Sequence, residues 1–129
     1  MIYFVQNHEK YSPSLAPVFA ALDAGEIEAV VSPVTLAECL VHPARLKRPE
    51  LEAAFRAGLL HGPGMSFQDI DPHVAITAAR IRAEYNVSLL DAFQLGAAQA
   101  SGCRALLTND LALKRFGGLE IVILDEHLP

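Results

Sequence analysis

Residues 88–110 have the sequence SLLDAFQLGAAQASGCRALLTND, which predicts a buried helix followed by a buried strand. Ser88 is a typical N-cap, and the helix expected over 89–101 ends at Gly102. This helix is apolar nearly all round, so we expect it to be buried on most of its sides. Residues 104–108 then predict a short strand. A buried helix that leads directly into a strand is typical of an α/β fold.

The same alternation of helices and strands extends along the rest of the chain. Residues 72–85 are the clearest amphipathic helix, because apolar side chains recur there every three to four positions. Ser32 is the expected N-cap of another helix, with Pro33 at its first position. Further helices are predicted over 13–24, 50–60 and 111–116, and further strands over 27–31, 66–70 and 120–124. This alternation predicts a mostly parallel sheet covered on both faces.

The composition fits one globular domain over residues 1–129, since 52% of the residues are hydrophobic and 19% are charged. A net charge of −5 argues against a broad basic surface for nucleic acid. No signal peptide is visible, and no apolar stretch reaches the roughly 18 residues of a membrane span. Cys39 and Cys103 lack metal-ligand spacing and are expected to be reduced. We therefore expect a cytoplasmic protein without membrane contact.

Three carboxylates, Glu38, Asp91 and Asp110, stand almost alone inside apolar stretches. Asp91, for example, is the only charged side chain between Glu84 and Arg104. Burial of an uncompensated carboxylate is costly, and several carboxylates brought together repel one another unless a divalent cation holds them. All three are expected near the carboxyl ends of strands, where parallel α/β folds place their sites. The sequence therefore indicates an acidic metal site.

Each of these acids also has an ordinary structural explanation. Ser88 and Asp91 have the spacing of a capping box, and so do Thr35 and Glu38 if their helix begins late. Asn109 or Asp110 is placed to cap the short helix over 111–116. For a single residue the structural role is the more common one. The three together, embedded in apolar sequence, favour the metal site.

Three segments of the chain resemble successive motifs of the PIN domain, SPVTLAECL, SLLDAFQLGAA and LLTNDLALKRF. They are similar to those of the VapC-like toxins of bacterial type II toxin–antitoxin modules, and on these motifs Glu38, Asp91 and Asp110 match acids of the family. The resemblance implies a three-layer α/β/α sandwich with a mostly parallel central sheet. It implies a Mg²⁺- or Mn²⁺-dependent endoribonuclease, in which Asp91 and Asp110 bind the metal and Glu38 binds metal or orients the attacking water. It also implies a cognate antitoxin and a homodimer.

The opening segment departs from the family pattern. The family carries a first acid near the end of its opening strand, whereas this chain begins with MIYFVQNHEKYS and has no Asp before Asp23. The segment resembles the part of the family pattern immediately after that motif, so we expect the opening strand to be absent through N-terminal truncation; a misassigned start and a degraded homologue are the alternatives. If the chain folds as it stands, Ile2–Val5 or a second copy would fill the gap in the sheet. Asn7 and Glu9 are the nearest polar substitutes for the acid.

Thr108, Arg45 and Lys114 are the candidate contacts to an RNA substrate. The alternatives are a solvated surface for the two cations and a structural role for Thr108. Two other functions stay open: a catalytically inactive PIN-like domain that acts through protein–protein contact, and an unrelated doubly wound protein such as a phospho-acceptor domain. The second requires two adjacent acids after its first strand, which the sequence lacks.

Overall fold

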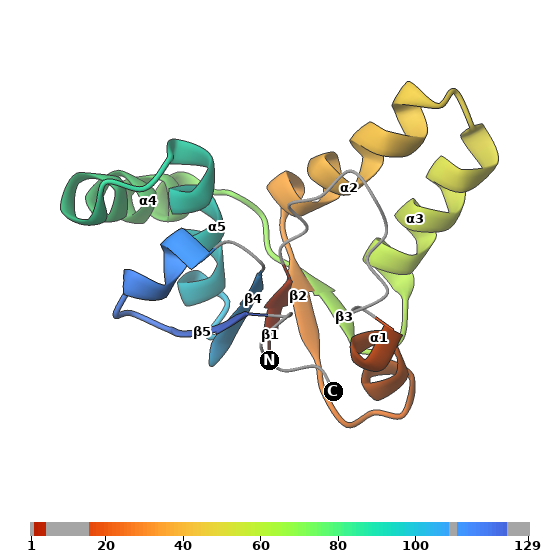
Figure 1. The fold of residues 1–129 in the computed structure, drawn as a ribbon, viewed down its shortest axis with the longest axis horizontal. Helices are drawn as coiled ribbons and strands as arrows, with labels where there is room; N and C mark the ends of the chain where they lie inside the picture. The colour runs from red at the N-terminus through yellow and green to blue at the C-terminus, as the bar shows by residue number, and fades with distance from the viewer. Residues whose placement is uncertain (1, 5–15, 109–110, 124–129) are drawn as a thin grey trace.

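The structure is a computed structural model that describes residues 2–4, 16–108 and 111–123 (Figure 1). Its elements in chain order are β1 (Ile2–Phe4), α1 (Ala16–Asp23), β2 (Ala29–Val31), α2 (Pro33–Arg45), α3 (Pro49–His61), β3 (Met65–Phe67), α4 (Pro72–Tyr85), α5 (Leu89–Ala100), β4 (Ala105–Thr108), the 3-10 helix η2 (Leu111–Arg115) and β5 (Glu120–Ile123). Within this described part of the chain, no helix has the length and apolar character to cross a membrane.

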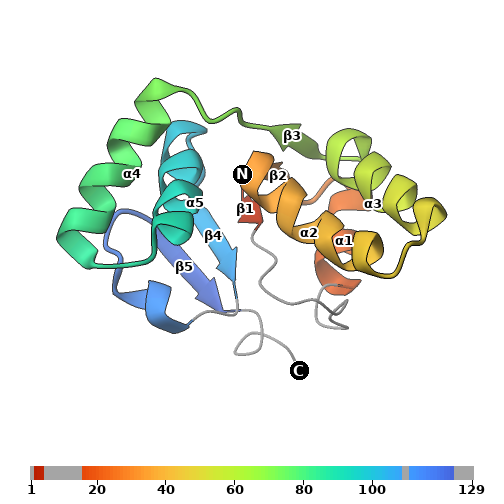
Figure 2. The same ribbon diagram turned by 90° about the horizontal axis from the view of Figure 1, so that it is seen from above.

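The strands form one sheet in the order β3-β2-β1-β4-β5, and every neighbouring pair is parallel. Helices α1, α2 and α3 lie beside β2 and β3, whereas α4 and α5 lie beside β4 and β5 (Figures 1 and 2). Adjacent strand residues belong to different apolar cores. Val30 and Leu106 pack with α4 and α5, while Val31 and Leu107 pack with Leu59 of α3. The predicted α/β/α arrangement with a parallel sheet is therefore confirmed.

The centre of the sheet is occupied by β1, so the expectation that the opening strand is absent was wrong. Ile2 pairs with Ala29 of β2 and with Ala105 of β4, which means that β1 joins the two halves of the sheet. The alternative use of Ile2–Val5 as a strand is confirmed for Ile2–Phe4. Without the acid of the family pattern, this apolar segment resembles a later part of that pattern. A short apolar run can pair in a sheet whether or not an acid comes after it.

The predicted elements lie where expected, with shifts at their ends. The helix over 72–85 is confirmed as α4, and the helix predicted over 89–101 is α5. The strand predicted over 66–70 ends earlier, at Phe67, because Asp71 is used to cap α4 by accepting a hydrogen bond from the Val74 amide at 2.9 Å. The helix predicted over 111–116 is a single 3-10 segment.

The N-caps of α2 and α5 test the two capping boxes predicted for Glu38 and Asp91. Ser32 accepts from the Val34 amide at 3.2 Å and starts α2, so Thr35 lies inside the helix and a capping box of Thr35 with Glu38 is excluded. Ser88 accepts from the Asp91 amide at 3.1 Å, which is one half of the capping box predicted for α5. Glu38 therefore has no capping role at this position.

Helix α5 is the most deeply buried helix of the described chain. Leu95 is 0% exposed, and Gly96 lies so close to α4 that an added Cβ would be 3.3 Å from the Val74 carbonyl oxygen. The absence of a side chain at Gly96 lets α4 approach α5 closely, and Val74 and Ala78 of α4 join Leu95 in the same core. Because α5 carries Asp91 in its first turn, this packing also fixes the position of a candidate site residue.

Truncation of Leu95 tests this packing. We expect Leu95→Ala to lower the free energy of unfolding by about 2–5 kcal/mol, because it removes buried methyl groups and leaves a cavity between α4, α5 and the sheet. Urea unfolding followed by circular dichroism measures the change. The matched control is Leu89→Ala on the same helix, where the side chain is 51% exposed and the expected loss is below about 1 kcal/mol. Equal losses in the two variants would contradict the core position of Leu95.

Candidate active site

Two of the three predicted acids, Glu38 and Asp91, come together at one edge of the sheet. Glu38 lies on α2, which follows β2, and Asp91 lies in the first turn of α5, which leads into β4. Because the strands are parallel, the start of α2 and the start of α5 both lie at the carboxyl edge. Both side chains are half-buried. The convergence predicted from the sequence is therefore seen for this pair.

The surroundings of Glu38 shift the pKa of its carboxyl. Burial raises the pKa of this carboxyl above its ordinary value; the hydrogen bond from Gln94 lowers the pKa, and the negative charge of Asp91 raises it. Burial has the largest effect of the three. The contribution from Asp91 requires that the two acids interact across the contact between α2 and α5. Two carboxylates held in this way repel each other, and a cation between them would relieve the repulsion.

A buried glutamine connects Glu38 to the interior. Gln94 donates from Nε2 to Glu38 Oε1 at 2.6 Å and accepts from Thr35 Oγ1 at 3.1 Å. Thr35 is predicted from the sequence only as a capping candidate, and Gln94 is not among the predicted site residues. The available signal was an amide one turn after Asp91 on a mostly apolar helix, at a position where burial requires polar partners.

Some of the other predicted site residues lie within the described part of the chain and some lie outside it. Asp110, Asn7 and Glu9 lie outside the described residues, so their place in the site stays a prediction. Thr108 is fully buried at the carboxyl end of β4, two residues before Asp110 in the sequence. Arg45, in the last turn of α2, and Lys114, in η2, are exposed. Contact of these three residues with RNA also stays a prediction.

The donor set fits a hard divalent cation. Carboxylate oxygens are the ligands that Mg²⁺ and Mn²⁺ prefer, and Glu38 and Asp91 supply them from two different helices. Among residues 2–4, 16–108 and 111–123, no group of three or more His, Cys, Asp or Glu side chains is placed to hold a metal. A full ligand set therefore requires Asp110 or water in addition to the described pair.

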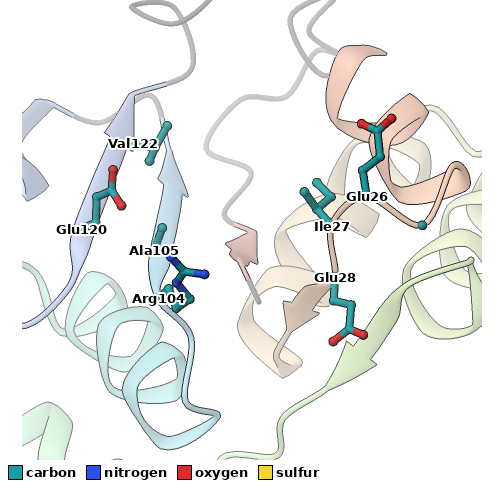
Figure 3. Close-up of a pocket in the computed structure, with 8 residues that line it drawn as sticks. Glu26, Ile27, Glu28, Arg104, Ala105, Glu120 and Val122 are labelled. Atoms are coloured by element: carbon teal, nitrogen blue, oxygen red, sulfur yellow. The ribbon is translucent and has the colours of Figure 1, made fainter.

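A separate pocket lies at the opposite end of the sheet (Figure 3). It has a volume of about 490 Å³ and is formed by residues at the amino ends of β2, β4 and β5, on both sides of β1. Its lining residues are Gly25, Glu26, Ile27, Glu28, Arg104, Ala105, Glu120 and Val122. Because parallel α/β folds place their sites at the carboxyl ends of the strands, this pocket is not part of the candidate active site.

The raised pKa of Glu38 predicts a pH-dependent stability in metal-free buffer. As pH rises above 4.5, the ordinary value, the unfolded chain releases the Glu38 proton first, so the contribution of Glu38 to stability falls until the folded carboxyl has ionised. Glu38→Gln stays neutral and avoids this loss. We therefore expect the difference in unfolding free energy, Glu38→Gln minus the unsubstituted protein, to increase as the pH rises from about 4 to 7.

Urea unfolding in EDTA at several pH values measures this difference. The control is Glu84→Gln on the exposed side of α4, which accounts for the general effect of removing one negative charge. If the two proteins instead differ in unfolding free energy by the same amount at every pH, that result would contradict a half-buried Glu38 that is repelled by the charge of Asp91.

Comparison with known proteins shows the family of the chain. Residues 1–119 match the profile of the PIN domain. The chain is similar to VapBC2 from Rickettsia felis bound to a promoter DNA fragment, with a TM-score of 0.72, 19% identity, and coverage of 95% of this chain and 98% of that chain. It is similar to DNA-bound VapBC from Salmonella typhimurium, with a TM-score of 0.72, 20% identity, and coverage of 96% and 98%.

A third similar structure is VapC20 from Mycobacterium tuberculosis, a toxin that cleaves the sarcin–ricin loop. Its TM-score is 0.60 and its identity 13%, with 82% of this chain and 87% of that chain covered. No curated protein matches the chain. At these identities the solved structures establish the fold alone, whereas the family profile spans most of the sequence. The chain therefore belongs to the PIN domain family, and its fold is like that of the VapC-type toxins.

Proposed function

We propose that this chain is a metal-dependent endoribonuclease of the VapC-like toxin kind, which cleaves phosphodiester bonds in RNA. The observation that carries the proposal is the approach of Glu38 and Asp91 from α2 and α5 at the carboxyl edge of a PIN fold. Glu38 has no capping role, and its half-buried carboxylate lies where the negative charge of Asp91 repels it, as is expected for two ligands that share a cation. Similarity to an RNA-cleaving toxin of the same fold supports RNA as the substrate.

The roles of the residues derive from their positions. Glu38, Asp91 and Asp110 would hold Mg²⁺ or Mn²⁺ through carboxylate oxygens. When bound, such a cation polarises the scissile phosphate and lowers the pKa of an attacking water. Arg45 and Lys114 provide positive charge for RNA phosphates on a protein whose net charge is −5. Thr108, the last residue of β4, is the third candidate contact to the substrate.

We also propose a protein antitoxin as the partner that keeps the nuclease inactive, together with assembly as a homodimer. Toxin–antitoxin complexes among the structures of similar fold support the antitoxin. An RNase of this kind would act in the cytoplasm, where its substrate is found.

A second candidate function is that of a catalytically inactive PIN domain that acts through protein contacts. The observation that favours it is the sequence after β1, where Gln6 and Asn7 stand and no Asp occurs before Asp23. Fewer acids at the site would weaken metal binding, because affinity for hard cations depends on the number of charged ligands. RNA cleavage by the purified protein separates the two functions.

Substitution of Asp91 tests the nuclease. With Mn²⁺ or Mg²⁺ present, we expect Asp91→Asn to reduce the rate of RNA cleavage more than about 100-fold, because loss of a direct ligand should exceed the 10–100-fold cost typical of residues that only support ligands. Cleavage of structured RNA fragments, followed on denaturing gels, measures the rate, and EDTA should abolish it.

The matched control is Asp23→Asn at the end of α1, an exposed carboxylate close in sequence to the amino end of β2. This variant should cleave at the unsubstituted rate. Equal cleavage by Asp91→Asn and Asp23→Asn would exclude the proposed role of Asp91. A folded, unsubstituted protein that cleaves no RNA with either cation would favour the inactive domain.

A further inference from the structure

The contact between α2 and α5 is organised by two pairs of residues with the same spacing. Thr35 and Glu38 are three positions apart on α2, and Asp91 and Gln94 are three positions apart on α5, so each pair lies on one face of its helix. Gln94 contacts both members of the α2 pair. Thr35 and Gln94 are 0% and 1% exposed, whereas Glu38 and Asp91 are half-buried. The contact therefore has an uncharged inner half and a carboxylate outer half.

The two hydrogen bonds of Gln94 fix its amide in one orientation. An ionised carboxylate can only accept hydrogen bonds, so the NH₂ group must face Glu38 and the carbonyl oxygen must face the Thr35 hydroxyl. Thr35 thus holds the amide, and the amide holds Oε1 of Glu38 at 2.6 Å. This hydrogen bond also lowers the pKa of Glu38 against the opposing effects of burial and of Asp91. One oxygen of the carboxylate is occupied within the protein.

We propose that Gln94 is a positioning residue for Glu38, which engages a divalent cation through Oε2 while Oε1 stays hydrogen-bonded to the amide. The inference rests on the proposed metal-dependent nuclease and adds a residue to its machinery. A long, flexible glutamate loses side-chain entropy when it binds a cation, and an amide that already holds the carboxylate reduces that loss. Partners that orient metal ligands typically change metal affinity 10–100-fold when they are removed.

The test replaces the amide by an apolar side chain of similar length. Gln94→Met keeps a side chain of similar volume in the core and removes both hydrogen bonds of the amide. The measurement is the melting temperature of the full chain titrated with Mn²⁺, compared with its value in EDTA, from which the Mn²⁺ dissociation constant is obtained by linkage. RNA cleavage provides a second measurement.

We expect Gln94→Met to weaken Mn²⁺ binding about 10-fold or more, with a smaller effect for Thr35→Val, which removes only the hydroxyl that holds the amide. The control Gln99→Met lies on the same helix at an exposed position, where Gln99 donates to the Gly118 carbonyl oxygen, and should bind Mn²⁺ as the unsubstituted protein does. A merely structural Gln94 would lower the melting temperature in EDTA and leave the Mn²⁺ dissociation constant of the folded protein unchanged.

The outcomes separate this inference from the proposed function. If Mn²⁺ binds and Glu38→Gln weakens it, but Gln94→Met binds with unchanged affinity, the positioning role is overturned and the nuclease proposal stands. If Gln94→Met does not fold, Thr35→Val decides, and unchanged Mn²⁺ affinity in that variant overturns the role. If the unsubstituted protein shows no Mn²⁺-dependent stabilisation at millimolar concentration, both proposals are overturned.

Discussion

The two halves of this protein are joined by the backbone hydrogen bonds of a three-residue strand. β1 pairs with β2 on one side and with β4 on the other, so α1, α2 and α3 are connected through it to α4 and α5. The main-chain groups of β2 and β4 that face the centre would lack partners without it, and unpaired buried groups of this kind are costly. The approach of α2 to α5, and with it the contact between Glu38 and Asp91, depends on this central pairing.

The candidate site balances electrostatic repulsion against local hydrogen bonding. Burial and the charge of Asp91 both disfavour an ionised Glu38, whereas the amide of Gln94 favours it. The net effect is a raised pKa of Glu38, because burial and the charge of Asp91 together outweigh the hydrogen bond. A fold that keeps such a site needs a compensating core, and α5 supplies one through Leu95 and its close packing on α4. The helix that carries Asp91 and Gln94 is therefore also part of this apolar core.

Membership of the PIN family and the departure from its pattern both bear on function. The family profile extends from residue 1 to residue 119, so it includes the central strand. The departure lies in the residues after β1, where a neutral Gln6 and Asn7 stand in the sequence and the first acid is Glu9. Under the proposed function, Glu38, Asp91 and Asp110 would therefore supply the charged ligands of the cation without a further acid.

The sequence by itself determined which segments are helices and strands, because side-chain periodicity, N-caps and glycine stops act within a few residues; α4 and the start of α2 are direct results of them. It also identified Glu38 and Asp91 as acids out of place in apolar surroundings. Only the tertiary structure decided that Ile2–Phe4 is the central strand, since strand order depends on pairing between distant segments. Likewise, the bond from Gln94 to Glu38 spans 56 residues, and no local pattern specifies which buried amide meets which carboxylate.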